Sequence, residues 1–250
     1  MKVAIAGAGG HMGRTLIEAV LADRELELAA ALEVAGNPVV GTEIGKTKVT
    51  SDAGMVALAD VLIDFTRPEG TIAHLKHARA VVIGTTGFTD TQKASIADAA
   101  KRIPVVMAAN FAVGVNAAYK LAETAARILG EGYDVEIVEA HHRHKVDAPS
   151  GTALKLGEII ASVFKQNDFV FGRKGETGER PVKQVGYHSI RGGDIVGEHT
   201  VIFAGTGERV EVTVRSQSRM TYALGALRAA KWLKGRPAGL YGMEDVLGLR

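Results

Sequence analysis

A glycine-rich turn near the N-terminus, set between an apolar run and a helical pattern, constrains the fold of this chain more than any other feature. The apolar run is Val3–Ala6, and the turn reads Gly7-Ala8-Gly9-Gly10-His11-Met12-Gly13. Apolar residues then recur on one face as far as Ala22, and a second apolar run ends at Glu33. Strand, glycine turn, helix and strand in this order predict the start of a βαβ unit with parallel strands.

Three further apolar runs extend this pattern through the first two-fifths of the chain. They are Val61–Phe65, Val81–Gly84 and Val105–Ala108, and the helical segments between them are Pro68–Ala80 and Asp90–Arg102. Continuous runs of valine and isoleucine are typical of parallel strands that helices cover on both faces. We therefore expect an α/β unit of the Rossmann type in this region.

The pattern changes near Ala112. Helical stretches at 113–129 and 150–165 are followed by strands, and Val210–Arg215 alternates strictly between apolar and polar residues. Strict alternation predicts a strand with one exposed face, as in an antiparallel or mixed sheet. The second region is therefore expected to be an α+β domain with a half-exposed sheet.

Composition excludes several classes of protein. Lys and Arg number 30 against 28 Asp and Glu, and this net charge of +2 argues against nucleic acid and membrane partners. No apolar run approaches the roughly 18 residues that a membrane span requires. The chain has no cysteine, so it holds no disulfide, thiol nucleophile or cysteine-bound metal. A cytoplasmic location is the expectation, and redox chemistry would need a borrowed cofactor.

The glycine turn is a candidate binding site for a dinucleotide. Glycines let backbone N–H groups approach a pyrophosphate, which the positive end of the following helix stabilises. Glu33 stands where an acidic residue accepts the ribose hydroxyls and repels a 2′-phosphate. A turn chosen for packing and a solvated strand end are the alternatives. The candidate residues are Gly7, Ala8, Gly9, Gly10, His11, Met12 and Glu33.

Polar segments follow two of the later strands. Gly84-Thr85-Thr86 and Ala108-Ala109-Asn110-Phe111 come directly after apolar runs, where parallel sheets bind their ligands. Their hydroxyl, amide and backbone groups could hold the carboxamide of a nicotinamide ring. Ordinary turn chemistry explains the same residues, and the sequence leaves both readings open.

A basic segment carries the residues suited to proton transfer. It reads His141-His142-Arg143-His144-Lys145 and leads to Ser150-Gly151-Thr152, where a helix is expected to begin with Ser150 as its N-cap. The cations and the first N–H groups of the helix favour an anion such as a carboxylate. The alternatives are a solvated loop and a metal site. We expect no metal, because consecutive loop histidines seldom converge and Arg143 and Lys145 would repel the ion.

Together these motifs resemble those of one enzyme family. The run from Glu139 to Ala153, EAHHRHKVDAPSGTA, stands beside GAGGHMG, IDFTRPEG, VIGTTGF, AANFAVGVN and GDIVGEHT. The set closely resembles the 4-hydroxy-tetrahydrodipicolinate reductases, long called dihydrodipicolinate reductases, of bacterial lysine and diaminopimelate synthesis. The resemblance runs from the first strand to the C-terminal tail.

The resemblance implies an architecture and a set of roles. It implies a Rossmann-like dinucleotide-binding domain, 1–112 plus 222–250, with an inserted substrate domain, 113–221, that builds a homotetramer. Loss of water from a cyclic dicarboxylate and hydride transfer from a reduced nicotinamide are the implied chemistry. By similarity, His141 and Lys145 are the acid/base residues, and His142, Gly151 and Thr152 hold the substrate carboxylates. The segments described above correspond to the cofactor-binding positions.

Two departures bear on the choice of cofactor. Many relatives have Arg after the acidic residue of the second strand and Arg at position 11, whereas this chain has Val34 and His11. We therefore expect NADH to be preferred over NADPH, although the family often accepts both. The rival interpretations are a dinucleotide-sensing protein without turnover and another nicotinamide-dependent dehydrogenase, which would not explain the basic segment.

Overall fold

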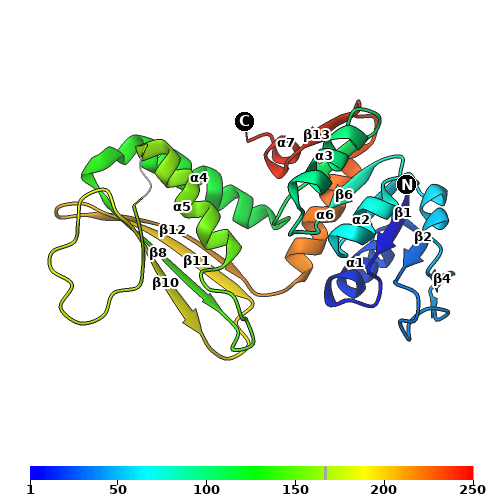
Figure 1. Ribbon diagram of the computed structural model, residues 1–250, viewed down its shortest axis with the longest axis horizontal. Coiled ribbons are helices and arrows are strands. Elements are labelled where there is room, and N and C mark those ends of the chain that lie inside the picture. The colour runs from blue at the N-terminus through cyan, green and yellow to red at the C-terminus, as the bar shows by residue number, and fades with distance from the viewer. Residues whose placement is uncertain (166–167, 250) are drawn as a thin grey trace. The chain divides into compact units, whose positions relative to one another are not determined.

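The computed structural model describes residues 1–165 and 168–249, which fold into two compact units. The first unit comprises residues 1–113 and the chain from residue 219 onward, and the second comprises residues 114–218 (Figure 1). The boundaries predicted from the sequence are after residue 112 and before residue 222. The chain leaves the first unit once and returns to it with its last long helix.

An eight-stranded sheet forms the centre of the first unit, in the order β13-β7-β6-β5-β1-β2-β4-β3. All neighbouring strands are parallel except β3 and β4. The chain order reverses at β1, which lies between β2 and β5, and parallel sheets bind ligands at such a reversal. The strands are β1 (Lys2–Ala6), β2 (Glu27–Leu32), β3 (Glu43–Ile44), β4 (Thr47–Thr50), β5 (Val61–Asp64), β6 (Val81–Ile83), β7 (Pro104–Met107) and β13 (Gly239–Tyr241).

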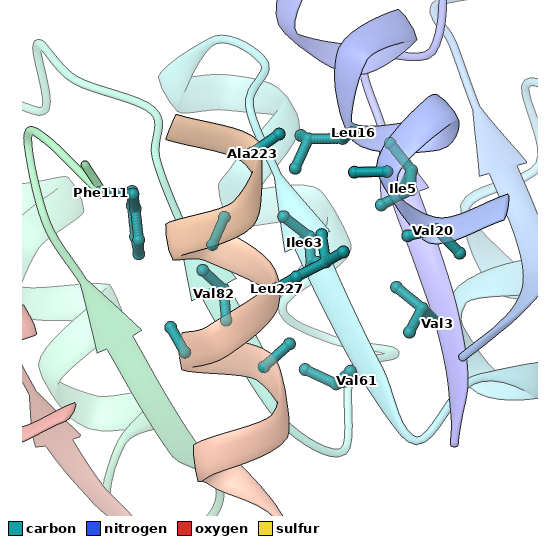
Figure 2. Close-up of a cluster of buried hydrophobic side chains, with 14 of the residues drawn as sticks. Val3, Ile5, Leu16, Val20, Val61, Ile63, Val82, Phe111, Ala223 and Leu227 are labelled. Carbon is teal, nitrogen blue, oxygen red and sulfur yellow. The ribbon is translucent and has the colours of Figure 1, made fainter. Parts of the chain in front are cut away.

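Helices cover both faces of this sheet because its strands are apolar on both sides. Along β1, Val3 and Ile5 join a core with residues of α1 and α6, whereas Ala4 and Ala6 join a second core on the other face. Figure 2 shows the first core, in which Leu227 of α6 packs among valines and isoleucines of the strands. The helices of this unit are α1 (His11–Ala22), α2 (Pro68–His74), α3 (Asp90–Ala99), α6 (Met220–Leu233) and α7 (Met243–Leu247), with a 3₁₀ turn at Ala53–Leu58.

A mixed five-stranded sheet forms the second unit, in the order β12-β11-β8-β10-β9. Strand β11 is antiparallel to both of its neighbours, whereas β10 is parallel to β8 and β9. Two helices and a 3₁₀ turn complete the unit. The elements are α4 (Val113–Leu129), the 3₁₀ turn Gly130–Gly132, β8 (Asp134–His141), α5 (Gly151–Phe164), β9 (Phe169–Phe171), β10 (Val185–Arg191), β11 (Gly197–Ala204) and β12 (Arg209–Ser216).

The two faces of the second sheet differ, as the strict alternation predicts. Ile137 of β8, Tyr187 of β10 and Val201 of β11 form a core with apolar residues of α4 and α5. Their chain neighbours point to the opposite face, where Ile190 remains 51% exposed. The mixed α+β architecture expected from the sequence is confirmed, and so is the parallel α/β sheet of the first unit.

The main differences from the sequence expectation lie at element ends. The helix expected at Pro68–Ala80 ends at His74, and the one expected at Asp90–Arg102 ends at Ala99. After His74 the backbone tightens into a turn, in which the N–H of His77 bonds to the carbonyl of His74. The β3–β4 hairpin was not predicted at all. Within residues 1–165 and 168–249, no helix combines the length and the apolar character of a membrane span.

Candidate functional site

The glycine turn lies between β1 and α1, at the carboxyl end of the central strand. Gly7 has a φ of +88°, and a Cβ atom on Gly13 would lie 1.9 Å from the carbonyl oxygen of Gly7. The N–H groups of Gly7 and Ala8 both donate to the carbonyl of Leu32, at 2.9 Å each. Glycine is therefore required at position 7 by its backbone conformation and at position 13 by close packing of the helix on the turn.

The N-terminus of α1 can receive an anion. Its N-cap is Gly10, no side chain caps the first turn, and that turn contains no acidic residue. Unsatisfied N–H groups and the helix dipole make such a terminus attractive to phosphate. The glycine turn thus has the backbone features that a pyrophosphate requires.

Glu33 lies beside this turn, at the end of β2. Its Oε2 atom accepts a hydrogen bond of 2.8 Å from the N–H of Gly9, and its Oε1 atom accepts one of 2.9 Å from the N–H of Val34. Val34 itself is 69% exposed. The carboxylate therefore stands next to the turn, with an uncharged side chain following it.

The segments after β6 and β7 lie at the same end of the sheet as the glycine turn. Gly84 is required by packing, because a Cβ atom there would lie 2.2 Å from the ring of Phe65. Thr85 is buried and Thr86 is exposed, whereas Ala108 and Ala109 are partly exposed or exposed. These segments are placed where the sequence predicts them, at strand ends.

Two residues of the later segment are engaged within the protein. Phe111 is only 1% exposed, and its ring lies 5.6 Å from that of Phe65. The Oδ1 atom of Asn110 accepts a hydrogen bond of 2.9 Å from the N–H of Ala112. Phe111 is therefore part of the core, and its carbonyl oxygen is packed so closely against α6 that a Cβ atom on Gly225 would lie 1.8 Å from it.

A buried carboxylate at the end of β5 was missed by the sequence reasoning. Oδ1 of Asp64 accepts hydrogen bonds from the hydroxyls of Thr66, Thr71 and Thr85, at 2.6, 3.0 and 3.3 Å. Its Oδ2 atom lies 2.7 Å from Nδ1 of His74. Asp64 is fully buried, and its hydrogen bond with Thr85 helps to hold the segment after β6 in place. The available signal was a charged residue inside the apolar run Val61–Phe65.

In the second unit, the basic segment begins at the carboxyl end of β8. His141 is buried, and its Nδ1 atom lies 2.5 Å from Oε2 of Glu139, which is 1% exposed. Arg191 of the neighbouring strand β10 pairs with His141 in the register and donates to both oxygens of Glu139, at 2.9 and 2.7 Å. The sequence reasoning assigned no role to Glu139 or Arg191.

The pKa values of Glu139 and His141 are both lowered, for different reasons. Burial raises the pKa of Glu139, but hydrogen bonds from Arg191, Ser189 and His141 outweigh burial and hold it at about 2. Burial lowers the pKa of His141 below its ordinary value, and the neighbouring Glu139 carboxylate opposes that effect. Glu139 is therefore ionised at neutral pH, and desolvation favours the neutral form of His141.

The rest of the basic segment is more open. Nζ of Lys145 lies 2.8 Å from both carboxylate oxygens of Asp147, a partner that the sequence reasoning missed. Nδ1 of His142 is buried and has no hydrogen-bond partner within the described ranges. The rings of His142 and His144 lie 6.2 Å apart. Among residues 1–165 and 168–249, no group of three or more His, Asp or Glu side chains is arranged to hold a metal ion.

Helix α5 begins at Gly151, a few residues after this segment. Ser150 is its N-cap, as predicted, and its Oγ atom accepts a hydrogen bond of 3.2 Å from the N–H of Ala153. The same hydroxyl lies 2.9 Å from Nε2 of His199 on β11. Gly151, in the first turn, is exposed. The N-terminus of α5 therefore begins at the surface, a few residues after the cationic segment.

His199 is a further buried histidine that the sequence reasoning missed. Its ring lies 5.1 Å from that of His141, edge to face, and burial together with the charge of His141 lowers its pKa to about 4. A histidine with so low a pKa is neutral at pH 7. His199 contacts the ring of His141 and the hydroxyl of Ser150, so it helps to hold both side chains in place.

Comparisons with known proteins give the same family for both units. Residues 1–111 match the family model for the N-terminus of dihydrodipicolinate reductase, and residues 114–247 match the model for its C-terminus.

Relatives that match this chain over its full length carry the name of the same enzyme. A protein of Burkholderia ambifaria (strain MC40-6) named 4-hydroxy-tetrahydrodipicolinate reductase is 56% identical, with all of both chains covered. One of the same name from Aromatoleum aromaticum is 54% identical, with all of this chain and 96% of the relative covered.

A solved structure is also similar. It is a dipicolinate-bound dihydrodipicolinate reductase from Paenisporosarcina sp. TG-14, with a TM-score of 0.81, 27% identity and 98% of each chain covered. Both halves of the chain and its overall fold thus agree with one assignment. This chain belongs to the dihydrodipicolinate reductase family.

Proposed function

We propose that this protein reduces 4-hydroxy-tetrahydrodipicolinate to tetrahydrodipicolinate with a reduced nicotinamide dinucleotide, in lysine and diaminopimelate synthesis. One molecule of water leaves the substrate, and one hydride and one proton enter it. The observation that carries the proposal is the segment His141–Lys145 leading to the N-terminus of α5, in a chain that is 56% identical to a reductase of this name over its full length. A dianionic substrate needs such a local positive field, which the net charge of +2 does not supply.

The first unit is proposed to hold the cofactor. The glycine turn fits a pyrophosphate, because Gly7 needs its positive φ and α1 begins without a capping side chain. Glu33 would accept the ribose hydroxyls. The residues proposed to hold the dinucleotide are Gly7, Ala8, Gly9, Gly10, His11, Met12, Glu33, Gly84, Thr85, Thr86, Ala108, Ala109, Asn110 and Phe111.

NADH is the proposed preferred cofactor, and NADPH the slower one. The Glu33 carboxylate would lie close to a 2′-phosphate and repel it. Val34, which is exposed and uncharged, offers that phosphate no compensating cation. His11 is a weaker phosphate partner than an arginine would be.

His142, Gly151 and Thr152 are proposed to hold the substrate carboxylates. Nδ1 of His142 is buried without a partner in the described ranges, and a buried polar atom in that state costs about 1–3 kcal/mol. A carboxylate oxygen would satisfy that atom if it carries a proton. The first N–H groups of α5 would bind a second carboxylate through the positive end of the helix dipole.

His141 and Lys145 are proposed to supply and relay the proton. Protonation of the ring nitrogen draws electrons from the conjugated ring and makes C4 electrophilic. The reduced nicotinamide, when bound, supplies the hydride that C4 accepts. Nζ of Lys145 donates to Asp147, and the ring of His141 offers a second site for a transferred proton. The location proposed for such an enzyme is the cytoplasm, which holds the pools of nicotinamide cofactor and substrate.

A homotetramer is the proposed assembly, and the second unit is the part proposed to build it. The face of its sheet turned away from α4 and α5 carries Val138, Ile190 and Ile202, so apolar surface remains available for a second copy. Sedimentation of the purified protein tests this proposal. A single species at the mass of four chains supports it, and monomers overturn it.

The reaction is tested by following nicotinamide absorbance with the purified protein and substrate made freshly from pyruvate and aspartate semialdehyde. We expect consumption that requires the substrate and is faster with NADH than with NADPH. No consumption with either cofactor, from folded protein that still binds NADH, would overturn the assignment. Equal efficiency with both cofactors would overturn the preference alone.

A further inference from the structure

The carboxylate of Glu139 has a role that the proposed acid/base residues leave unexplained. It is 1% exposed and accepts hydrogen bonds from three parts of the second unit. These are the ring of His141 at 2.5 Å, both terminal nitrogens of Arg191 at 2.9 and 2.7 Å, and the N–H of Ser150 at 3.3 Å. Moving this carboxylate would leave Arg191 and the other donors without their acceptor, which is strongly destabilising in a buried site. The position of the carboxylate is therefore well determined.

The contact with His141 decides which ring nitrogen is available for chemistry. An ionised carboxylate only accepts hydrogen bonds, so Nδ1 of His141 must carry a proton toward Glu139. In neutral His141 the other nitrogen, Nε2, is then the atom that can take up a proton. Without Glu139, either nitrogen could hold the proton, and the ring could rotate.

The same ion pair also holds the chain that follows His141. Nη2 of Arg191 donates to the carbonyl oxygen of Asp147 at 2.8 Å, and the N–H of Ser150 donates to Glu139. Asp147 in turn holds Lys145 through its carboxylate. Both the segment that carries Lys145 and the start of α5 are thus attached to one buried pair.

We propose that Glu139, held by Arg191, is a positioning residue that fixes the tautomer and ring orientation of His141 and anchors the segment between His141 and Ser150. This inference rests on the proposed role of His141 in proton transfer. It also explains how His141 is prepared for that role. The pairing of β8 with β10 brings Arg191 to Glu139, and Glu139 then determines which ring nitrogen of His141 can take up a proton.

The charges around His141 predict how its titration responds. Glu139 and Arg191 face it from β8 and β10, His199 faces it from β11, and Lys145 and Asp147 lie on the segment that follows. Of these groups, Glu139 raises the pKa of His141, whereas Lys145 and Arg191 lower it. Replacing Glu139 by a neutral residue therefore moves the pKa of His141 further down.

The chain contains a matched control on the same strand. Glu136 accepts hydrogen bonds from both terminal nitrogens of Arg173, at 3.0 and 2.9 Å, and from Nε2 of His188 at 2.7 Å. Because side chains alternate along a strand, Glu136 and Glu139 point to opposite faces of the sheet. Nε of Arg180 also donates to Glu136, at 2.9 Å. Glu136 is thus a glutamate paired with two arginines and a histidine, away from His141.

The experiment compares Glu139→Gln with Glu136→Gln in the NADH-dependent reductase assay across pH. For Glu139→Gln we expect kcat to fall by about 10²-fold, the lower end of what a positioned acid contributes. The limb of the pH profile that reports His141 should move to lower pH, and the dissociation constant for NADH should stay unchanged. For Glu136→Gln we expect lower thermal stability and an unshifted pH profile.

A spectroscopic measurement tests the tautomer directly. In ring-labelled protein, the Nδ1 proton of His141 should give a strongly deshielded NMR signal, assigned by its loss in His141→Gln. This signal should persist in Glu136→Gln and vanish in Glu139→Gln. If Glu139→Gln does not fold, Arg191→Lys keeps the positive charge but loses the paired hydrogen bonds, so it should lower kcat. The pH profile should shift less than in Glu139→Gln, because the Glu139 carboxylate still raises the pKa of His141. An unchanged kcat in Arg191→Lys would overturn the positioning role.

The outcomes separate two kinds of failure. An unshifted pH profile and an unchanged ring signal in Glu139→Gln overturn the positioning role, and so does a shift of equal size in Glu136→Gln. Normal turnover in His141→Gln overturns the proposed acid/base role instead, and the positioning role of Glu139 falls with it.

Discussion

Oε2 of Glu33 accepts a 2.8 Å hydrogen bond from the N–H of Gly9, so the carboxylate at the end of β2 is fixed against the glycine turn that follows β1. The two residues follow neighbouring parallel strands, β1 and β2, and meet at the carboxyl edge of the sheet. This contact places one negative charge beside the proposed pyrophosphate site. The residue after it, Val34, is exposed and brings no positive charge.

The cofactor preference can therefore be shifted at Val34. Val34→Arg places a guanidinium beside the proposed ribose site, where it can pair with a 2′-phosphate. We expect the ratio of kcat/KM for NADPH to that for NADH to rise by roughly ten-fold, equivalent to about 1.4 kcal/mol. Val34→Gln, which is long but uncharged, is the control and should leave the ratio unchanged. An unaltered ratio in Val34→Arg would show that the ribose end lies elsewhere.

The buried Asp64 network predicts a combined loss of stability and cofactor binding. In Asp64→Asn, an amide replaces a carboxylate that accepts from three threonine hydroxyls, and some donors lose their acceptor. We expect about 1–3 kcal/mol lower stability by urea unfolding. We also expect a higher dissociation constant for NADH, because Thr85 is one of those threonines.

Asp60→Asn provides the control for this change. Asp60 is exposed and accepts one hydrogen bond from the N–H of Lys2, at the opposite end of the parallel strands from Asp64. Stability and NADH binding should both stay near those of the unchanged protein. Wild-type NADH affinity in a folded Asp64→Asn protein would contradict the proposed link to the cofactor site.

The paired glutamates of β8 predict a loss of stability in acid. Burial raises the pKa of Glu136, but hydrogen bonds from Arg173, Arg180 and His188 outweigh burial and hold it at about 2, against an ordinary value of 4.5. A carboxyl whose pKa is lower in the folded protein stabilises the fold above its unfolded pKa, and this contribution disappears as the pH falls toward 2.

Glu136→Gln should therefore flatten the dependence of unfolding free energy on pH. We expect the variant to be less stable than the wild-type protein at pH 7, and the difference to shrink as the pH falls from about 5 to about 3. Urea unfolding at several pH values measures this. A difference that stays constant across that range would contradict the assigned pKa.

Local patterns predicted the first unit well, because its signals lie close together in the sequence. The glycine turn and the helical period fixed β1, α1 and β2, and the valine-rich runs located the parallel strands. The strands of the β3–β4 hairpin are too short to show an alternation of apolar and polar residues. Helix α2 ends earlier than its apolar pattern predicts, because the chain must turn before β6 begins at Val81. Strand β13 pairs with β7, which lies more than a hundred residues earlier in the chain. A local sequence pattern cannot predict such a pairing.

The site was predicted in part for the same reason. His141 and Lys145 lie in one continuous basic segment, which a local motif can show. Their partners come from elsewhere: Arg191 reaches Glu139 through the register of β8 with β10, and His199 reaches Ser150 from β11. Glu139 lies within the same motif, but its role depends on a partner some fifty residues away.

The most direct test of the account compares cofactor binding with turnover in Lys145→Ala. Dinucleotide binding is proposed for the first unit, and proton transfer for the basic segment of the second. We expect NADH to bind Lys145→Ala as tightly as the wild-type protein, while substrate-dependent NADH consumption falls by roughly 10²-fold or more. Normal turnover in Lys145→Ala would contradict the central claim, and the basic segment would then have to serve another purpose.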